Sequence, residues 1–159
     1  MRKILTSLLI VAILATSVVC CVACQKDKAF EGSAFDAFKA LKDAGTIEME
    51  YTESAEYGAW ISKITYDGLV MGDAGYPMIY VNNRKYRDEL QGMGNDYTYN
   101  GEEFYASNVG VSSIVFEEGM KILVVYTEEV EPGTYTYAVK KGPALLFTLP
   151  NGVEKTTID

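Results

Sequence analysis

The sequence predicts an α+β fold, with an antiparallel sheet or half-barrel of about seven to nine strands and one N-terminal amphipathic helix packed on it. Three observations predict this class. Hydrophobic residues follow the helical period in one stretch only, which ends at Gly45. After Gly45 the period changes to two, and turn pairs such as Asp67-Gly68 and Asn100-Gly101 separate short strands. No second long helical pattern alternates with these strands, as a parallel sheet would require.

The N-terminus has the pattern of a secretory signal. Arg2 and Lys3 precede a long apolar stretch, residues 4–23, that ends in small residues. The alternative is a retained transmembrane anchor, because about twenty apolar residues can span a bilayer. The absence of a basic stop after the stretch favours a cleaved signal over an anchor.

The end of this stretch resembles a bacterial lipoprotein signal, in which a small residue precedes the cysteine that receives lipid. Cys24 follows Ala23 and fits, whereas Cys20 and Cys21 lack the small residue before them. The resemblance implies a signal peptide over 1–23, a lipidated Cys24 bearing diacylglycerol and acyl chains such as palmitate, and a tether over 24–30. Several acyl chains hold a protein on a membrane stably. We therefore expect a secreted protein, lipid-anchored on the outer side of a bacterial membrane.

The remaining residues, 31–159, are expected to form a single α+β domain. Two basic residues leave with the signal, so the mature chain would have 12 basic and 22 acidic residues, a net charge of −10. Such a surface repels nucleic-acid phosphates. The chain has no histidine, which removes His-based catalytic triads and almost every zinc site. Its paired acids are neighbours in strands and would face opposite sides. We expect no catalytic residues, no metal, no cofactor and no enzymatic activity.

The helix is predicted over residues 33–45, "SAFDAFKALKDAG". Ser33 is a favourable N-cap and Asp36 stands three residues later, as in a capping box. Phe35, Phe38 and other apolar residues recur at helical spacing, and Gly45 ends the helix. The apolar face is expected to pack on a sheet. A second interpretation is that the two phenylalanines close over a bound hydrophobic ligand.

Alternating or apolar runs predict the strands, and turn residues separate them. The run "KILVVYT" is apolar on both faces and is expected to be a central strand. The predicted strand segments are 46–52, 59–66, 76–81, 85–90, 97–105 with a hairpin turn inside it, 111–116, 121–127, 134–140 and 144–149.

Aromatic residues are the most unusual feature of the composition. All 12 tyrosines lie between Tyr51 and Tyr137, together with Trp60, the single tryptophan. Tyrosine is a favoured strand residue that buries an apolar ring, so a structural role is one interpretation. The other is a binding face, because these side chains give a large contact area at a low entropic cost.

The order of elements resembles the lipoprotein-localisation carrier superfamily, the LolA-like half-barrel, and its lipid-anchored relatives. The resemblance rests on a lipidated cysteine, a helix ending "FKALKDAG", the strand "TIEMEYT", hairpins around "YDG" and "YNG", and a closing "LLFTLPNGVEK". It implies an incomplete barrel whose concave apolar face, covered by helix, holds acyl chains or another hydrophobic ligand. The chain departs from the superfamily in being short and having fewer helices, and no site residue of the family is carried over.

Two functions remain open. The first is a non-enzymatic cell-envelope lipoprotein that binds a lipid or other hydrophobic ligand in the concave face of the sheet. It predicts a cavity of several hundred Å³, on the order of other ligand sites. Its candidate lining residues are Phe35, Phe38, Trp60, Ile64 and Met78. The second is a surface interaction module that presents a Tyr-rich face to a protein or glycan partner, and it predicts an exposed apolar patch.

Overall fold

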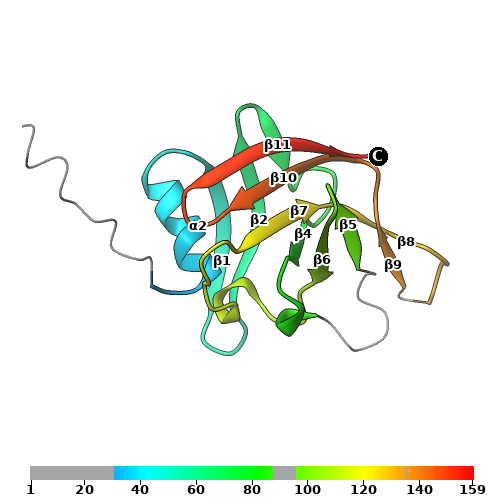
Figure 1. Cartoon of the computed structure of the whole chain (residues 1–159), viewed down its shortest axis with the longest axis horizontal. Helices are drawn as coiled ribbons and strands as arrows, with labels where there is room; N and C mark the ends of the chain where they lie inside the picture. Colours follow the sequence, from blue (N-terminus) through cyan, green and yellow to red (C-terminus); the bar gives the residue numbers. More distant parts are fainter. Residues whose placement is uncertain (1–30, 88–95, 135) are drawn as a thin grey trace, which may run out of the picture. The chain divides into compact units, whose positions relative to one another are not determined.

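The computed structural model describes residues 31–87, 96–134 and 136–159. Glu31–Asp159 form one compact unit, in which the described residues form antiparallel sheets and a single α-helix, arranged as in Figure 1. The elements are, in order, α2 (Ala34–Asp43), β1 (Glu48–Ser54), β2 (Gly58–Tyr66), β3 (Leu69–Met71), β4 (Met78–Val81), the 3₁₀-helix η1 (Arg84–Tyr86), β5 (Tyr97–Tyr99), β6 (Glu102–Ala106), the 3₁₀-helix η2 (Val111–Ser113), β7 (Lys121–Val125), β8 (Thr127–Glu129), β9 (Tyr137–Val139), β10 (Gly142–Thr148) and β11 (Gly152–Ile158).

Helix α2 begins with the predicted capping box. The backbone N–H of Asp36 donates to the Ser33 hydroxyl at 3.2 Å, and the Ser33 backbone N–H donates to the Asp36 carboxylate at 2.8 Å. These two bonds satisfy backbone N–H groups that have no partner inside the helix. The helix ends where Gly45 adopts a positive φ of 72°.

A six-stranded sheet forms the larger part of the core. Its order is β11-β10-β7-β4-β6-β5 and all its pairings are antiparallel. The sheet curls into a half-barrel, so that its two edge strands, β5 and β11, approach each other. The hydroxyl of Tyr99 on β5 is hydrogen-bonded to the hydroxyl of Thr156 on β11. Strand β7 lies inside the sheet, as its two-sided apolar sequence predicts, and its residues Ile122–Val125 are completely buried.

The inner face of the half-barrel is filled by its own side chains. Eight residues from five of its strands form one cluster in which no side chain is more than 8% exposed: Tyr80, Phe104, Ala106, Leu123, Val125, Ala144, Leu146 and Ile158. Because side chains alternate along a strand, Phe147 points to the other face of the sheet. There its ring meets Phe38 of helix α2 at a centroid distance of 4.6 Å.

The second sheet has three strands in the order β1-β2-β3. The turn Asp67-Gly68, with positive φ at both residues, joins β2 to β3 as predicted for this residue pair. The register of β1 against β2 shifts between Glu50 and Tyr51, where β2 has one extra residue. The bulge lets Trp60, opposite Thr52, and Lys63, opposite Glu50, share the outer face of the sheet.

The position of the helix and the number of strands correct the sequence prediction. Helix α2 does not cover one face of a single sheet. It contacts η2, and its Phe35 ring lies 5.1 Å from Tyr51 of β1 while Phe38 meets β10, so it joins the two sheets. The structure has eleven strands in three sheets, counted over the described residues, instead of seven to nine. The third sheet is the hairpin of β8 and β9.

Individual strand predictions were also wrong. Residues 111–116 form η2 and a single bridge between Val115 and Ser33, because their backbone binds the start of the helix. Residues 84–86 form η1, with the Asn83 side chain accepting a hydrogen bond at its start. Strands β3, β8 and β11 are short or strongly polar and lack the alternating pattern that the other strands show.

Candidate functional site

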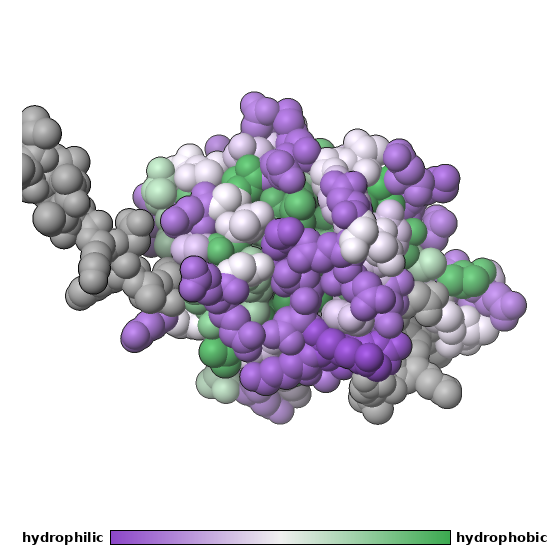
Figure 2. Space-filling view, in the orientation of Figure 1, coloured by the Kyte–Doolittle hydropathy of each residue, from purple (hydrophilic) through white to green (hydrophobic). Residues whose placement is uncertain are grey.

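An apolar groove lies where β2, β4 and the segment after β6 meet. Its volume is about 270 Å³. Three stretches line it, Ala59–Ile61, Pro77–Ile79 and Ser107–Val111, and none of these residues carries a charged side chain. We call it the β2–β4 groove. Figure 2 shows that one face of the molecule is mainly hydrophilic, with hydrophobic side chains in small separate areas.

Two exposed aromatic rings stand at the rim of the groove. Ala59 and Ile61 of β2 point inward and are buried, so the alternation of the strand turns Trp60 outward, where it is 53% exposed. The ring of Tyr76, itself 71% exposed, packs edge-on against Trp60 at a centroid distance of 5.8 Å. Large exposed aromatic side chains are typical of binding surfaces and uncommon elsewhere.

The loop between β3 and β4 positions Tyr76. Gly72 and Gly75 have φ values of 131° and 139°, which residues with a side chain rarely adopt. The backbone N–H of Gly72 donates to the hydroxyl of Tyr126 at 2.7 Å, and Pro77 restricts the end of the loop. The loop is therefore held at both ends, and the aromatic pair has a defined position.

The opposite wall is attached to β2. The backbone N–H of Ala59 donates to the Ser112 hydroxyl at 3.0 Å. Gly58 has no side chain at a point where a Cβ would lie 2.1 Å from this hydroxyl oxygen. The Ser107 hydroxyl donates to the carbonyl of Val109 at 2.8 Å, so it is already occupied. Asn108 is exposed, and its side-chain amide forms no hydrogen bond within the described part of the chain.

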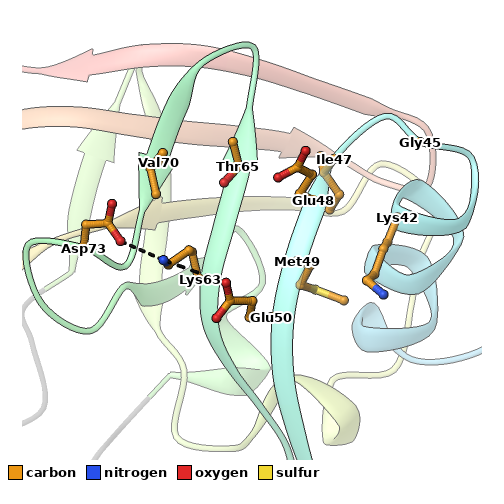
Figure 3. A pocket seen from close by; sticks show the side chains of 10 residues that line it. All are labelled: Lys42, Gly45, Ile47, Glu48, Met49, Glu50, Lys63, Thr65, Val70 and Asp73. Atoms are coloured by element: carbon orange, nitrogen blue, oxygen red, sulfur yellow. Dashed lines mark ion pairs between the residues drawn. The ribbon is translucent and has the colours of Figure 1, made fainter.

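A second hollow, of about 600 Å³, lies on the outer face of the three-stranded sheet (Figure 3). It is mainly polar. Its lining residues come from the end of α2, from β1, β2 and β3, and from the following loop: Lys42, Gly45, Ile47, Glu48, Met49, Glu50, Lys63, Thr65, Val70 and Asp73. We call it the charged hollow.

Lys63 is the central charge of this hollow. Figure 3 shows its ammonium group between two carboxylates, Asp73 at 2.9 Å and Glu50 at 3.8 Å. The hydrogen bond with Asp73, and then the charges of Asp73 and Glu50, raise the pKa of Lys63. At the other end of the hollow, the Lys42 ammonium lies 5.6 Å from the ring centroid of Tyr51. Glu48 forms no ion pair among the described residues.

The structure places the five predicted ligand-binding residues in two environments. Trp60 and Met78 lie together in the β2–β4 groove. Phe35, Phe38 and Ile64 are buried in the core and line neither this groove nor the charged hollow. Cys24, the predicted signal peptide over 1–23 and the tether over 24–30 lie outside the described residues.

Tyr80 is an unusual residue inside the half-barrel. Its side chain is completely buried, and its hydroxyl is the one buried side-chain oxygen or nitrogen of the described residues that has no hydrogen-bond partner. Burial, and secondarily the charge of Asp96, raises the pKa of Tyr80 to about 12. A buried hydroxyl without a hydrogen-bond partner lowers the stability of the fold, and such groups are rare in folded proteins.

Neither a metal site nor a membrane span is visible in the described part of the chain. Its His, Cys, Asp and Glu residues form no group of three that could hold a metal ion. None of its helices has the length and apolar character needed to cross a bilayer.

Sequence reasoning did not select Tyr76, Val109, Asn108 or the charged hollow. No local signal marks the outward ring of Trp60: in "AWISKITY" strict alternation would place it on the same face as Ile64, which is buried, and only the bulge in β2 separates the two. The contribution of the loop and of the segment after β6 depends on tertiary structure. Comparison with protein-family models, with curated proteins and with solved structures found no match to this chain. The resemblance to the lipoprotein-localisation carriers therefore stays a prediction.

Proposed function

We propose that this chain is a non-enzymatic, lipid-anchored interaction module of a bacterial cell envelope, which holds a protein partner by an apolar side chain seated in the β2–β4 groove. The observation that carries the proposal is the uncharged groove with exposed Trp60 and Tyr76 at its rim. Tryptophan and tyrosine are the residue types that dominate the energetics of protein interfaces. The anchor at Cys24 would keep this surface close to the membrane.

The volume of the groove favours a side chain over a lipid. Sites for small molecules and cofactors measure roughly 300–1,000 Å³, and the groove, at about 270 Å³, is smaller than that. The interior of the half-barrel is filled by its own buried residues. One apolar anchor residue of a partner fits a groove of this size, and the rest of the partner can lie on the surrounding surface.

The chemistry of the groove favours a protein over a glycan. A sugar ring can stack on Trp60, but its hydroxyl groups also need hydrogen-bond partners. Among the groove side chains, the hydroxyl of Ser107 is occupied and the amide of Asn108 is free. An apolar side chain needs no such partners and gains from leaving water.

The test uses the single tryptophan as a reporter inside the site. Peptides selected by display on the chain from Gln25 onward, which contains the whole described domain, are titrated while Trp60 emission is recorded. We expect selected peptides to share an apolar anchor, to shift Trp60 emission and to shield it from a soluble quencher. They should bind Met78→Ala at least about fivefold more weakly, because truncating an anchor contact at the centre of an interface costs over about 1 kcal/mol.

Val130→Ser is the matched control, because Val130 is an exposed apolar residue that does not line the groove. It should leave affinity unchanged. Selected peptides that bind without affecting Trp60, or that bind Met78→Ala as well as the original chain, would refute the assignment of the groove.

A second candidate function is binding of a hydrophobic ligand inside the half-barrel, as the LolA-like resemblance implies, and it requires the side chains that fill the interior to move apart. The unpartnered hydroxyl of Tyr80 supports it, because a ligand with an acceptor oxygen would satisfy that group. Native mass spectrometry of the chain recovered from envelope membranes tests it. A discrete added mass of acyl-lipid size, lost on unfolding, would support this candidate. A bare chain mass after incubation with lipid extract would exclude it.

A further inference from the structure

The β2–β4 groove and the charged hollow are neighbouring parts of one surface. Strand β2 contributes Trp60 to the groove and Lys63 to the hollow. The loop between β3 and β4 contributes Asp73 to the hollow, and its Tyr76 packs on Trp60. A partner that seats a side chain in the groove and continues along β2 therefore passes over the hollow.

The distance between the two parts suits a short extended segment. Trp60 and Lys63 lie opposite Thr52 and Glu50, which are two residues apart on β1 because of the bulge in β2, so their separation corresponds to roughly 7 Å. An extended peptide covers this distance in about two residues, and side chains two positions apart point to the same side of it. A side chain about two positions from the apolar anchor would thus reach the carboxylates around Lys63.

The charge of the hollow favours a cation at that position. Three carboxylates line it, from Glu48, Glu50 and Asp73, against the ammonium groups of Lys42 and Lys63. Lys63 is already shared by two of the acids, and Glu48 has no ion pair in the described part of the chain. The net charge of the whole chain, −8, adds to the same field.

We infer that the partner segment carries a lysine or arginine about two residues from its apolar anchor, and that this basic residue binds Glu50 and Asp73 at the expense of Lys63. The inference rests on the proposed function, because the anchor in the groove sets the position of the basic residue. It specifies the chemistry of the partner, a segment with an apolar and a basic residue at fixed spacing.

The test compares versions of one selected peptide that differ at the position two residues from the anchor. Lysine, norleucine and glutamate are placed there, and affinity is measured from Trp60 emission at low and at high salt. We expect lysine to bind about two- to fivefold more tightly than norleucine at low salt, and glutamate more weakly, since exposed ion pairs contribute on this scale. High salt should remove the differences.

Two variants of the hollow should change the lysine preference in opposite directions. Asp73→Asn removes a carboxylate and should weaken binding of the lysine peptide. Lys63→Met removes the internal competitor and should strengthen it. If the Lys63–Asp73 pair only held the loop in place, both variants would weaken every peptide equally, and the inference would be overturned.

Lys155→Met is the matched control. Lys155 forms an ion pair with Asp67 at 2.6 Å, and neither residue lines the β2–β4 groove or the charged hollow. It should leave the lysine preference unchanged. Equal affinity of the three peptides, with Trp60 emission still responding, would refute this inference and leave the proposed function intact. If no apolar-anchored peptide affects Trp60, both fail.

Discussion

Asp36 contributes to the stability of helix α2 through its charge. The backbone N–H of Ser33, and then the Ser33 hydroxyl, donate hydrogen bonds to its carboxylate and lower its pKa. A lowered folded pKa means that the stabilisation is complete above the ordinary value and is lost as pH falls through the folded value.

Asp36→Asn should therefore lower the free energy of unfolding by about 0.3–1 kcal/mol at neutral pH, the usual contribution of an acid at a helix N-terminus. The difference from the original chain should shrink as pH falls below about 4 and disappear below the folded pKa. Urea unfolding at a series of pH values measures it. Ser33→Ala, which removes the cap itself, should instead cost about 1 kcal/mol, and an Asp36→Asn deficit that persists in acid would contradict the explanation.

Tyr80 gives the opposite case, in which a polar group destabilises the fold. Tyr80→Phe removes an unpaired buried hydroxyl and should raise the free energy of unfolding of the ligand-free chain by about 1–3 kcal/mol. The raised pKa also makes stability depend on pH. Because the neutral phenol is favoured in the folded state, the free energy of unfolding should fall as pH rises from 10.0, the ordinary pKa of tyrosine, to about 12, the pKa in the folded chain.

Unfolding midpoints of the original chain and of Tyr80→Phe, measured between neutral and strongly alkaline pH, test both the gain in stability and its pH dependence. Tyr80→Phe should be more stable throughout and should lose less stability above pH 10. A loss of stability in Tyr80→Phe would mean that the hydroxyl has a partner, such as a bound guest.

At the scale of elements, the loop from β3 to β4 depends on Gly72. A Cβ at this position would lie 2.4 Å from the carbonyl oxygen of Ser62, which belongs to the backbone of β2 and has little freedom to move. Gly75, in the same loop, also has a positive φ but has no atom within 4 Å of the position of its Cβ. The two glycines thus separate a steric effect from a conformational one.

Gly72→Ala should destabilise the fold by about 1–3 kcal/mol beyond the conformational cost, as overpacking does elsewhere. It should also displace Tyr76 from Trp60 and shift the Trp60 emission. Gly75→Ala should cost only the conformational term, about 1 kcal/mol. Thermal unfolding monitored by Trp60 fluorescence compares them, and equal effects of both substitutions would rule out the clash with Ser62.

The sequence predicted the elements whose signals are local. The capping box at Ser33, the turns at Asp67-Gly68 and Asn100-Gly101, and the burial of β7 follow from residues that are neighbours in the chain. The run 111–116 has the β-branched and aromatic residues of a strand but binds the start of the helix, which no local pattern reveals. Of the candidate site, Trp60 and Met78 were predicted, whereas the groove exists only because segments around residues 60, 78 and 109 meet in space.

For the whole molecule, a lipid anchor at Cys24 would decide where the domain works. Cys24→Ser should release the protein from the membrane fraction or leave an uncleaved precursor, because the cysteine sulfur is the expected site of acylation. Fractionation with intact-mass measurement detects either result. A mature chain of unchanged mass that stays in the membrane fraction would contradict lipidation at this residue.

The contact between Phe38 and Phe147 joins the first described helix to the next-to-last strand. A chain growing from its N-terminus therefore completes helix α2 long before the ring that covers it has been made. Isolated helices of ten residues are marginal in water, and pairings between distant residues close slowly. A nascent chain that stops before β10 should consequently stay unfolded and sensitive to proteases, and it would remain able to pass through a narrow channel until β10 has been made.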